Sequence, residues 1–295
     1  MATATAPPRH RSRDAGIVVA CVAAFIVAMM GIAALADAGW FHGGTSAPPP
    51  AADAGDPMHR GEAWLVDNLD PSQRLIVDMK GAEDLTTRGV SEERVVAVPS
   101  SGDAPDALAA WREYDYVVST PALRAQLSRL PSAQAAIDSS MPVASFGTGA
   151  DQVVVRRIVP QGLDQVREQE AASKSLRRRA GAALAGNPNV SASAEALDVL
   201  RSGQVDERLL NVLATYSVGH RIRVGAFPAV EGEDDAGMPR RVATIESIDG
   251  QLIASGAPAA SSLDAFLGSQ QGEYRPASVT IEAPTLRVSY AIAQP

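Results

Sequence analysis

RLIVDM (residues 74–79), RVVAVP (94–99) and DYVVST (115–120) are the segments that decide the fold of the first half of this chain. Each is a short apolar run rich in β-branched residues, which is typical of a strand buried on both faces. Segments with helical spacing separate them. Such alternation predicts an α/β domain over residues 61–160, built on a mainly parallel sheet. The segment 143–158, with the turn GTG in its middle, predicts a hairpin at the edge of that sheet.

Polar side chains follow the three strands. In open sheets of parallel strands, ligands bind beyond the carboxyl ends of the strands. The candidate ligand-binding residues are therefore Asp78, Ser100, Ser119 and Thr120. A hydroxyl just before Pro121 also suits the N-cap of a helix, and capping is the simpler interpretation of Ser119 and Thr120.

The second half of the chain mixes helical segments with alternating ones. Sparse apolar residues among charges predict a connecting helix at 161–185. Residues 186–295 then combine two helices, separated by a glycine, with strands of the antiparallel kind, which predicts an α+β domain. An acidic loop at 231–237 is interpreted as exposed to solvent, with a weak calcium site as the alternative. His220 is interpreted as the C-terminal cap of a helix.

An uncharged apolar segment lies near the N-terminus, at residues 15–36. As a helix it would span about 33 Å, enough to cross the hydrocarbon core of a membrane. Three arginines precede it and an aspartate follows it, so the positive-inside rule places residues 1–14 in the cytoplasm and the bulk of the chain outside the cell membrane. Residues 37–60, rich in Gly, Pro and Ala, predict a linker.

Cleavage of the apolar segment as a signal peptide is the alternative, because Ala34-Leu35-Ala36 has the small-x-small form. The segment is longer than the usual signal core of about 7 to 15 residues. Trp40 and Phe41 follow it, where aromatic residues anchor a helix at the headgroups. We therefore expect a retained, single-pass transmembrane helix.

Charge and composition limit the classes of function. The net charge of −8 argues against binding nucleic acid, which needs a concentrated basic surface. The single cysteine, Cys21, lies in the apolar segment, so no intramolecular disulfide can form. A zinc hydrolase needs three protein ligands, and His220 is the only histidine after residue 186. No catalytic residue, metal ligand or cofactor is predicted.

Four segments carry a first resemblance: WLVDNL (64–69), RLIVD (74–78), YDYVVST (114–120), and FG before VVVRRI (153–158). With them, residues 62–158 resemble the extracytoplasmic α/β domain of actinobacterial membrane proteins of the glycosyltransferase type. The bias toward alanine, and toward arginine over lysine, is also common in actinobacteria. The sequence holds one segment of membrane-spanning length, not the many that carry transferase chemistry. The resemblance therefore implies a glycan or cell-envelope context without transferase activity.

NPNV (187–190), LRSGQVDERLL (200–210) and HRIRV (220–224) carry a second resemblance. Residues 180–255 resemble a domain of actinobacterial cell-wall proteins related to zinc-dependent peptidoglycan peptidases. In active relatives a histidine and an aspartate of this domain bind the metal. The matching segment here lacks the histidine and has Thr244 in place of the acid, which implies a degenerate domain.

These observations favour a non-catalytic, membrane-anchored envelope protein that binds or scaffolds cell-wall or exopolysaccharide machinery. Its expected partners are the membrane, through its own helix, and either cell-wall glycan or a polytopic membrane protein. Two alternatives stay open. One is a hydrolase of envelope glycan or peptidoglycan with an unrecognised site, and the other is an accessory subunit of a polytopic glycosyltransferase.

Overall fold

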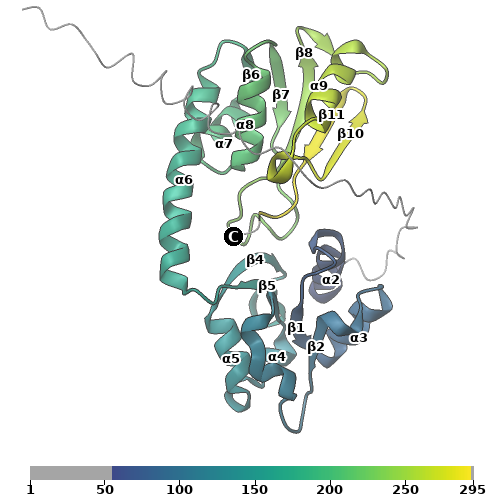
Figure 1. The fold of residues 1–295 in the computed structure, drawn as a ribbon, viewed down its shortest axis with the longest axis vertical. Helices are drawn as coiled ribbons and strands as arrows, with labels where there is room; N and C mark the ends of the chain where they lie inside the picture. Colours follow the sequence, from purple (N-terminus) through teal and green to yellow (C-terminus); the bar gives the residue numbers. More distant parts are fainter. Residues whose placement is uncertain (1–54, 294–295) are drawn as a thin grey trace, which may run out of the picture. The chain divides into compact units, whose positions relative to one another are not determined.

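The computed structural model describes residues 55–293 (Figure 1). The predicted tail, the transmembrane helix and most of the linker lie outside the described residues. Residues 50–295 belong to one compact unit, whose fold is mixed α/β with two mixed sheets. Of the helices within residues 55–293, none combines the length and the hydropathy that crossing a membrane requires.

Five strands form the first sheet, in the order β2-β1-β3-β5-β4. The strands are β1 (Leu75–Asp78), β2 (Val95–Val98), β3 (Tyr116–Ser119), β4 (Ser140–Phe146) and β5 (Val153–Ile158). β1 pairs in parallel with β2 and with β3, whereas β5 pairs antiparallel with both β3 and β4. The predicted edge hairpin is confirmed. The sheet is nevertheless mixed rather than mainly parallel, because strands joined by a short turn pair antiparallel and the hairpin joins the sheet through β5.

Helices cover both faces of this sheet (Figure 1). They are α2 (Pro57–Asn68), α3 (Met79–Thr87), α4 (Pro121–Arg124) and α5 (Pro131–Asp138). Side chains alternate along β1: Leu75 and Val77 pack in a core with α2 and α3, while Ile76 packs in a second core with α4 and α5. This two-sided burial explains the continuous apolar runs in the sequence.

Short 3₁₀ segments lie at η1 (Glu92–Arg94), η2 (Asp106–Glu113), η3 (Leu127–Arg129), η4 (Gly149–Asp151) and η5 (Gly272–Tyr274).

Helix α2 begins inside the segment predicted as a linker. Asp56 accepts a hydrogen bond from the Met58 backbone N–H at 3.1 Å, and Pro57 occupies the first turn. Both residue types are favoured at the start of a helix. The described fold therefore starts four residues earlier than the predicted boundary at residue 61.

The second sheet has the order β10-β11-β8-β7-β6, with β9 paired to β8. Its strands are β6 (Val190–Ala192), β7 (Ile222–Ala226), β8 (Val242–Ile248), β9 (Gln251–Leu252), β10 (Ser278–Glu282) and β11 (Thr285–Ser289). Only β6 and β7 pair in parallel. The helices are α6 (Leu163–Ala185), α7 (Ala194–Ser202), α8 (Glu207–Tyr216) and α9 (Pro258–Gly268), and the last three share one apolar core with the sheet.

The connecting helix α6 docks on this half at two glycines. A side chain at Gly181 would overlap the carbonyl oxygen of Leu200 on α7. Gly203, which ends α7 with φ of 78°, places its own carbonyl 3.1 Å from Arg177 Nε of α6. Close approach of two helices and a left-handed helix end both favour glycine. Arg177 of α6 is buried in this contact.

Two segments of the second half complete the core of the first. Val230 and Met238, from the loop between β7 and β8, pack against the core that holds α2 and α3, and Ile292 near the C-terminus is buried in it. The Ser145 backbone N–H donates to the Gly232 carbonyl at 2.9 Å, so the loop also bonds to β4. Because the two sheets share apolar contacts, we expect residues 55–293 to fold as one body.

Candidate functional site

The structure brings together two of the four predicted ligand-binding residues. Asp78 ends β1 and Thr120 follows β3, and the Thr120 hydroxyl donates a short hydrogen bond to Asp78 Oδ2. Each side chain also caps a helix. Asp78 Oδ1 accepts from the Gly81 N–H at 3.1 Å, and Thr120 Oγ1 accepts from the Leu123 N–H at 3.1 Å. These bonds satisfy free backbone donors at the starts of α3 and α4.

The other two predicted residues, Ser119 and Ser100, form no hydrogen bond with Asp78 or Thr120. Ser119 is buried, and its carbonyl oxygen accepts from Arg124 at 2.9 Å. Ser100 is exposed, and its carbonyl oxygen accepts from Arg129 at 3.3 Å. Ligand binding by these four residues therefore stays a prediction, and capping accounts for the contacts of Asp78 and Thr120.

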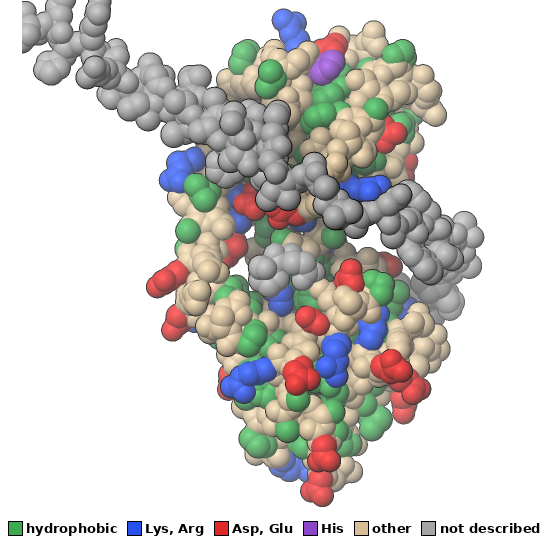
Figure 2. Space-filling view, viewed as in Figure 1, with side chains coloured by type: hydrophobic (Ala, Val, Ile, Leu, Met, Phe, Trp, Pro, Cys, Tyr) green, Lys and Arg blue, Asp and Glu red, His purple; other side chains and the backbone are tan. Residues whose placement is uncertain are grey.

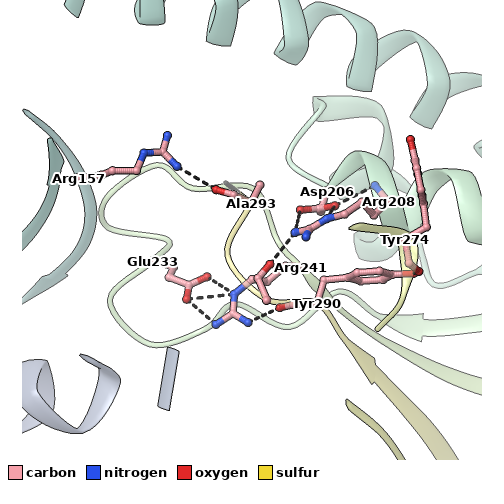
Figure 3. Close-up of polar contacts among 9 residues, drawn as sticks. Arg157, Asp206, Arg208, Glu233, Arg241, Tyr274, Tyr290 and Ala293 are labelled. Carbon is pink, nitrogen blue, oxygen red and sulfur yellow. Dashed lines mark hydrogen bonds and ion pairs between the residues drawn. The ribbon is translucent and has the colours of Figure 1, made fainter. Parts of the chain in front are cut away.

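The candidate functional centre of the described residues is a buried cluster of polar side chains around Glu233 and Arg241, called the junction below. Glu233, in the acidic loop, is only 3% exposed, so the prediction of a solvated loop is wrong at this residue. Its carboxylate binds Arg241 through two oxygens, at 2.8 and 2.9 Å (Figure 3). It also accepts from the Trp64 indole N–H of α2 at 2.9 Å. The loop is buried here because an arginine and an indole replace water as partners of the carboxylate.

Arg241 uses the rest of its guanidinium to join three parts of the chain. Besides Glu233, it donates a short hydrogen bond to the Tyr290 carbonyl (Figure 3). It donates another to the side-chain oxygen of Asn68 on α2. Every guanidinium nitrogen thus has a partner. The junction connects α2, the acidic loop and the C-terminal segment, and its charged groups are engaged in fixing these elements.

A second ion pair, between Arg208 and Asp206, also binds the C-terminal segment. Arg208 binds Asp206 with two nitrogens, at 2.9 and 2.8 Å, and donates to the Ala291 carbonyl at 2.6 Å (Figure 3). Asp206 also caps α8 by accepting from the Arg208 N–H at 2.8 Å. The Tyr290 ring lies 5.0 Å from the guanidinium, and burial raises the pKa of its phenol well above the ordinary value.

His220 occupies an open hollow on the second half. The prediction that it caps α8 is wrong, because the helix ends at Tyr216 and Ser217 is its C-cap. Its Nδ1 instead lies 2.8 Å from Asp249 Oδ2, and its ring stacks on Tyr216 at 4.4 Å. The hydrogen bond from His220 holds the pKa of Asp249 below its usual range. The hollow, about 370 Å³, is lined by Asn189, Val218, Gly219, His220, Arg221 and Asp249.

Metal binding finds little support in the described part of the chain. Among residues 55–293, no group of three or more His, Cys, Asp or Glu side chains lies where it could hold an ion. Thr244 accepts from the Ala226 N–H at 2.9 Å and so stabilises the irregular pairing of β7 with β8. On the face drawn in Figure 2, acidic and basic side chains are interspersed.

Comparison with known proteins gives no relative for this geometry. No family model matches the chain, and no curated protein or solved structure matches it at a significant level.

Proposed function

We propose that this chain is a non-catalytic, single-pass membrane protein of the cell envelope that binds or scaffolds cell-wall or exopolysaccharide machinery. Residues 15–36 form the transmembrane helix, residues 1–14 stay in the cytoplasm, and the α/β and α+β domains lie outside. The partners are cell-wall glycan or a polytopic membrane protein, and the latter would make the chain an accessory subunit.

The observation that carries this proposal is the ion pair between Glu233 and Arg241. A scaffold needs rigid surfaces, and the pair fixes the acidic loop to both α2 and the C-terminal segment. Buried carboxylates of catalytic or metal sites need a free face toward substrate, water or ion. Both carboxylate oxygens of Glu233 bind Arg241, and one of them also accepts from Trp64. These contacts support a structural role for the loop.

The sequence supports the anchored location. The uncharged length at 15–36 fits the hydrocarbon core, and the arginines before it fit the positive-inside rule. Helix α2 begins at Pro57, so about 20 residues rich in Gly, Pro and Ala separate the anchor from the folded part. This spacing would let the outer part work close to the membrane surface.

Membrane fractionation tests the proposal. The full chain in its source cells should resist alkaline carbonate extraction, and protease added outside spheroplasts should digest the outer part. Gentle detergent should then co-isolate cell-wall glycan or a polytopic membrane protein. As a control, changing Arg9, Arg11 and Arg13 to asparagine should reduce the fraction in this orientation.

Two results would contradict the proposal separately. Release of the chain by carbonate, or protection of its outer part from protease, would contradict the anchored topology. Recovery of the anchored chain with neither glycan nor a membrane partner would contradict the binding role.

A further inference from the structure

A hollow beside the first sheet contains two arginines that have no ion-pair partner among residues 55–293. It lies at the edge where β1 and β3 begin and β5 ends, opposite the edge that sequence reasoning selected. Its volume is about 240 Å³, and its lining residues are Gln73, Arg112, Glu113, Tyr114, Asp115, Tyr116, Arg157, Ile158, Pro160 and Gln161.

Arg157 is the first of these arginines. One of its terminal nitrogens donates to the Ala293 carbonyl at 2.9 Å (Figure 3). Its Nε is buried and has no hydrogen-bond partner in the described part of the chain. The second terminal nitrogen forms no hydrogen bond within residues 55–293, so the guanidinium still has a donor for a ligand that accepts hydrogen bonds.

Arg112 is the second. Its guanidinium lies over the Trp111 ring, 4.3 Å from the centroid, a contact that orients the side chain without neutralising its charge. No carboxylate of residues 55–293 lies within ion-pair distance of Arg112 or Arg157.

The carboxylates of the same hollow are already engaged by a third arginine. Asp115 Oδ2 accepts from the Arg74 backbone N–H at 2.7 Å, and Glu113 lies 3.6 Å from the Arg74 guanidinium. Arg74 itself is fixed over Tyr114 by stacking at 4.3 Å. Counted with Arg74, three arginines face two carboxylates at this hollow, so the local net charge is +1.

We propose that this hollow binds an anionic oxygen group, a carboxylate or a phosphate, on a ligand of about the size of one sugar. Arg157 and Arg112 are the cations, because a guanidinium matches the geometry of either anion. The Gln161 amide supplies a partner for a hydroxyl group. The site goes beyond the proposed function and stands without it, because only the described geometry carries it.

The probes are glucuronic acid, inorganic phosphate and uncharged glucose, titrated into the full chain in detergent by calorimetry, with saturation-transfer difference NMR as a second measurement for the two sugars. We expect at least one anion to bind with a Kd on the order of 1 mM or tighter, and glucose to bind more weakly. Added salt should weaken the binding, because the contacts are ionic. Preference for glucuronic acid would indicate an acidic sugar, and preference for phosphate a phosphorylated ligand.

Arg157→Gln should weaken anion binding by about 10-fold or more, since it removes a charge-assisted contact. Arg112→Gln should do so too, and it leaves the bond to Ala293 intact, so it separates ligand binding from fixing of the C-terminal segment. The matched control is Arg167→Gln on α6, which should bind like the wild type. Absence of anion binding, equal binding of glucose, or unchanged binding in both variants would overturn the site, and would leave the topology and co-isolation results unaffected.

Discussion

Replacing Glu233 with leucine should lower the free energy of unfolding by about 3–5 kcal/mol. The substitution leaves the buried guanidinium of Arg241 without a counter-charge, and it removes the acceptor of the Trp64 indole N–H. A buried charge that loses its partner is far more costly than a lost surface pair. Chemical denaturation of the full chain in detergent, followed by tryptophan fluorescence, measures the change.

The same loop provides the matched control. Glu231 pairs with Arg60 at 2.8 Å, but its side chain is 65% exposed, so Glu231→Leu should cost less than about 1 kcal/mol. The double change of Glu233 and Arg241 to leucine should be less destabilising than Glu233→Leu alone, because no buried charge is left unpaired. Equal losses for Glu233→Leu and Glu231→Leu would show that the junction does not hold the loop.

Helix α2 contains a second buried carboxylate, that of Glu62, which has a raised pKa. Glu62 is 3% exposed, and its Oε1 has no hydrogen-bond partner within residues 55–293. Arg88, the C-cap residue of α3, lies 3.4 Å from Oε2, but it also contacts His59 at 2.7 Å. Burial, reinforced by the nearby Asp84 and opposed by Arg88, raises the pKa of Glu62 from 4.5 to about 7.

Compared with the wild type, Glu62→Gln should therefore raise the free energy of unfolding more at pH 8 than at pH 4.5. The folded state holds the Glu62 proton more tightly than the unfolded chain, so stability falls as pH rises from about 4.5 to about 7. Each pKa unit corresponds to about 1.4 kcal/mol, so the full cost above pH 7 is up to about 3 kcal/mol. Glutamine has no charge to bury, and the difference between variant and wild type should grow with pH across this window.

Denaturant unfolding at several pH values between 4 and 8.5 measures this difference. Glu83→Gln, on the exposed face of α3, is the control and should follow the wild-type pH dependence. A Glu62→Gln curve parallel to the wild-type curve would show that the Glu62 carboxyl does not titrate in the folded protein near neutral pH.

Much of the fold could be predicted because local patterns determine it. The strands β1, β2 and β3 read as continuous apolar runs, and α6 matches the predicted connecting helix within two residues at its start. The sequence also indicates the glycine that ends α7. The elements that it does not predict include α5, β9 and the three-residue strand β6. Strand β6 is too short for a periodic pattern, and its pairing with β7 decides its state.

The site could be predicted only in part, because its residues are defined by distant contacts. Asp78 and Thr120 were selected from their place after strands, and the structure brings them together. Nothing local distinguishes Glu233 from its acidic neighbours, since its burial depends on Trp64, 169 positions earlier in the chain. The hollow around Arg157 lies at the opposite strand ends, and the lack of an ion-pair partner is a tertiary property that no spacing reveals.

Native-state hydrogen exchange tests the central claim most directly, namely that the two sheets act as one body through the shared core and the junction. In the full chain, the slowest amides of β1 and β3 should exchange with the same opening free energy as those of β8 and β11, at every denaturant concentration. Loss of protection in β8 and β11 while β1 and β3 stay protected would contradict the claim, because the halves would then open independently.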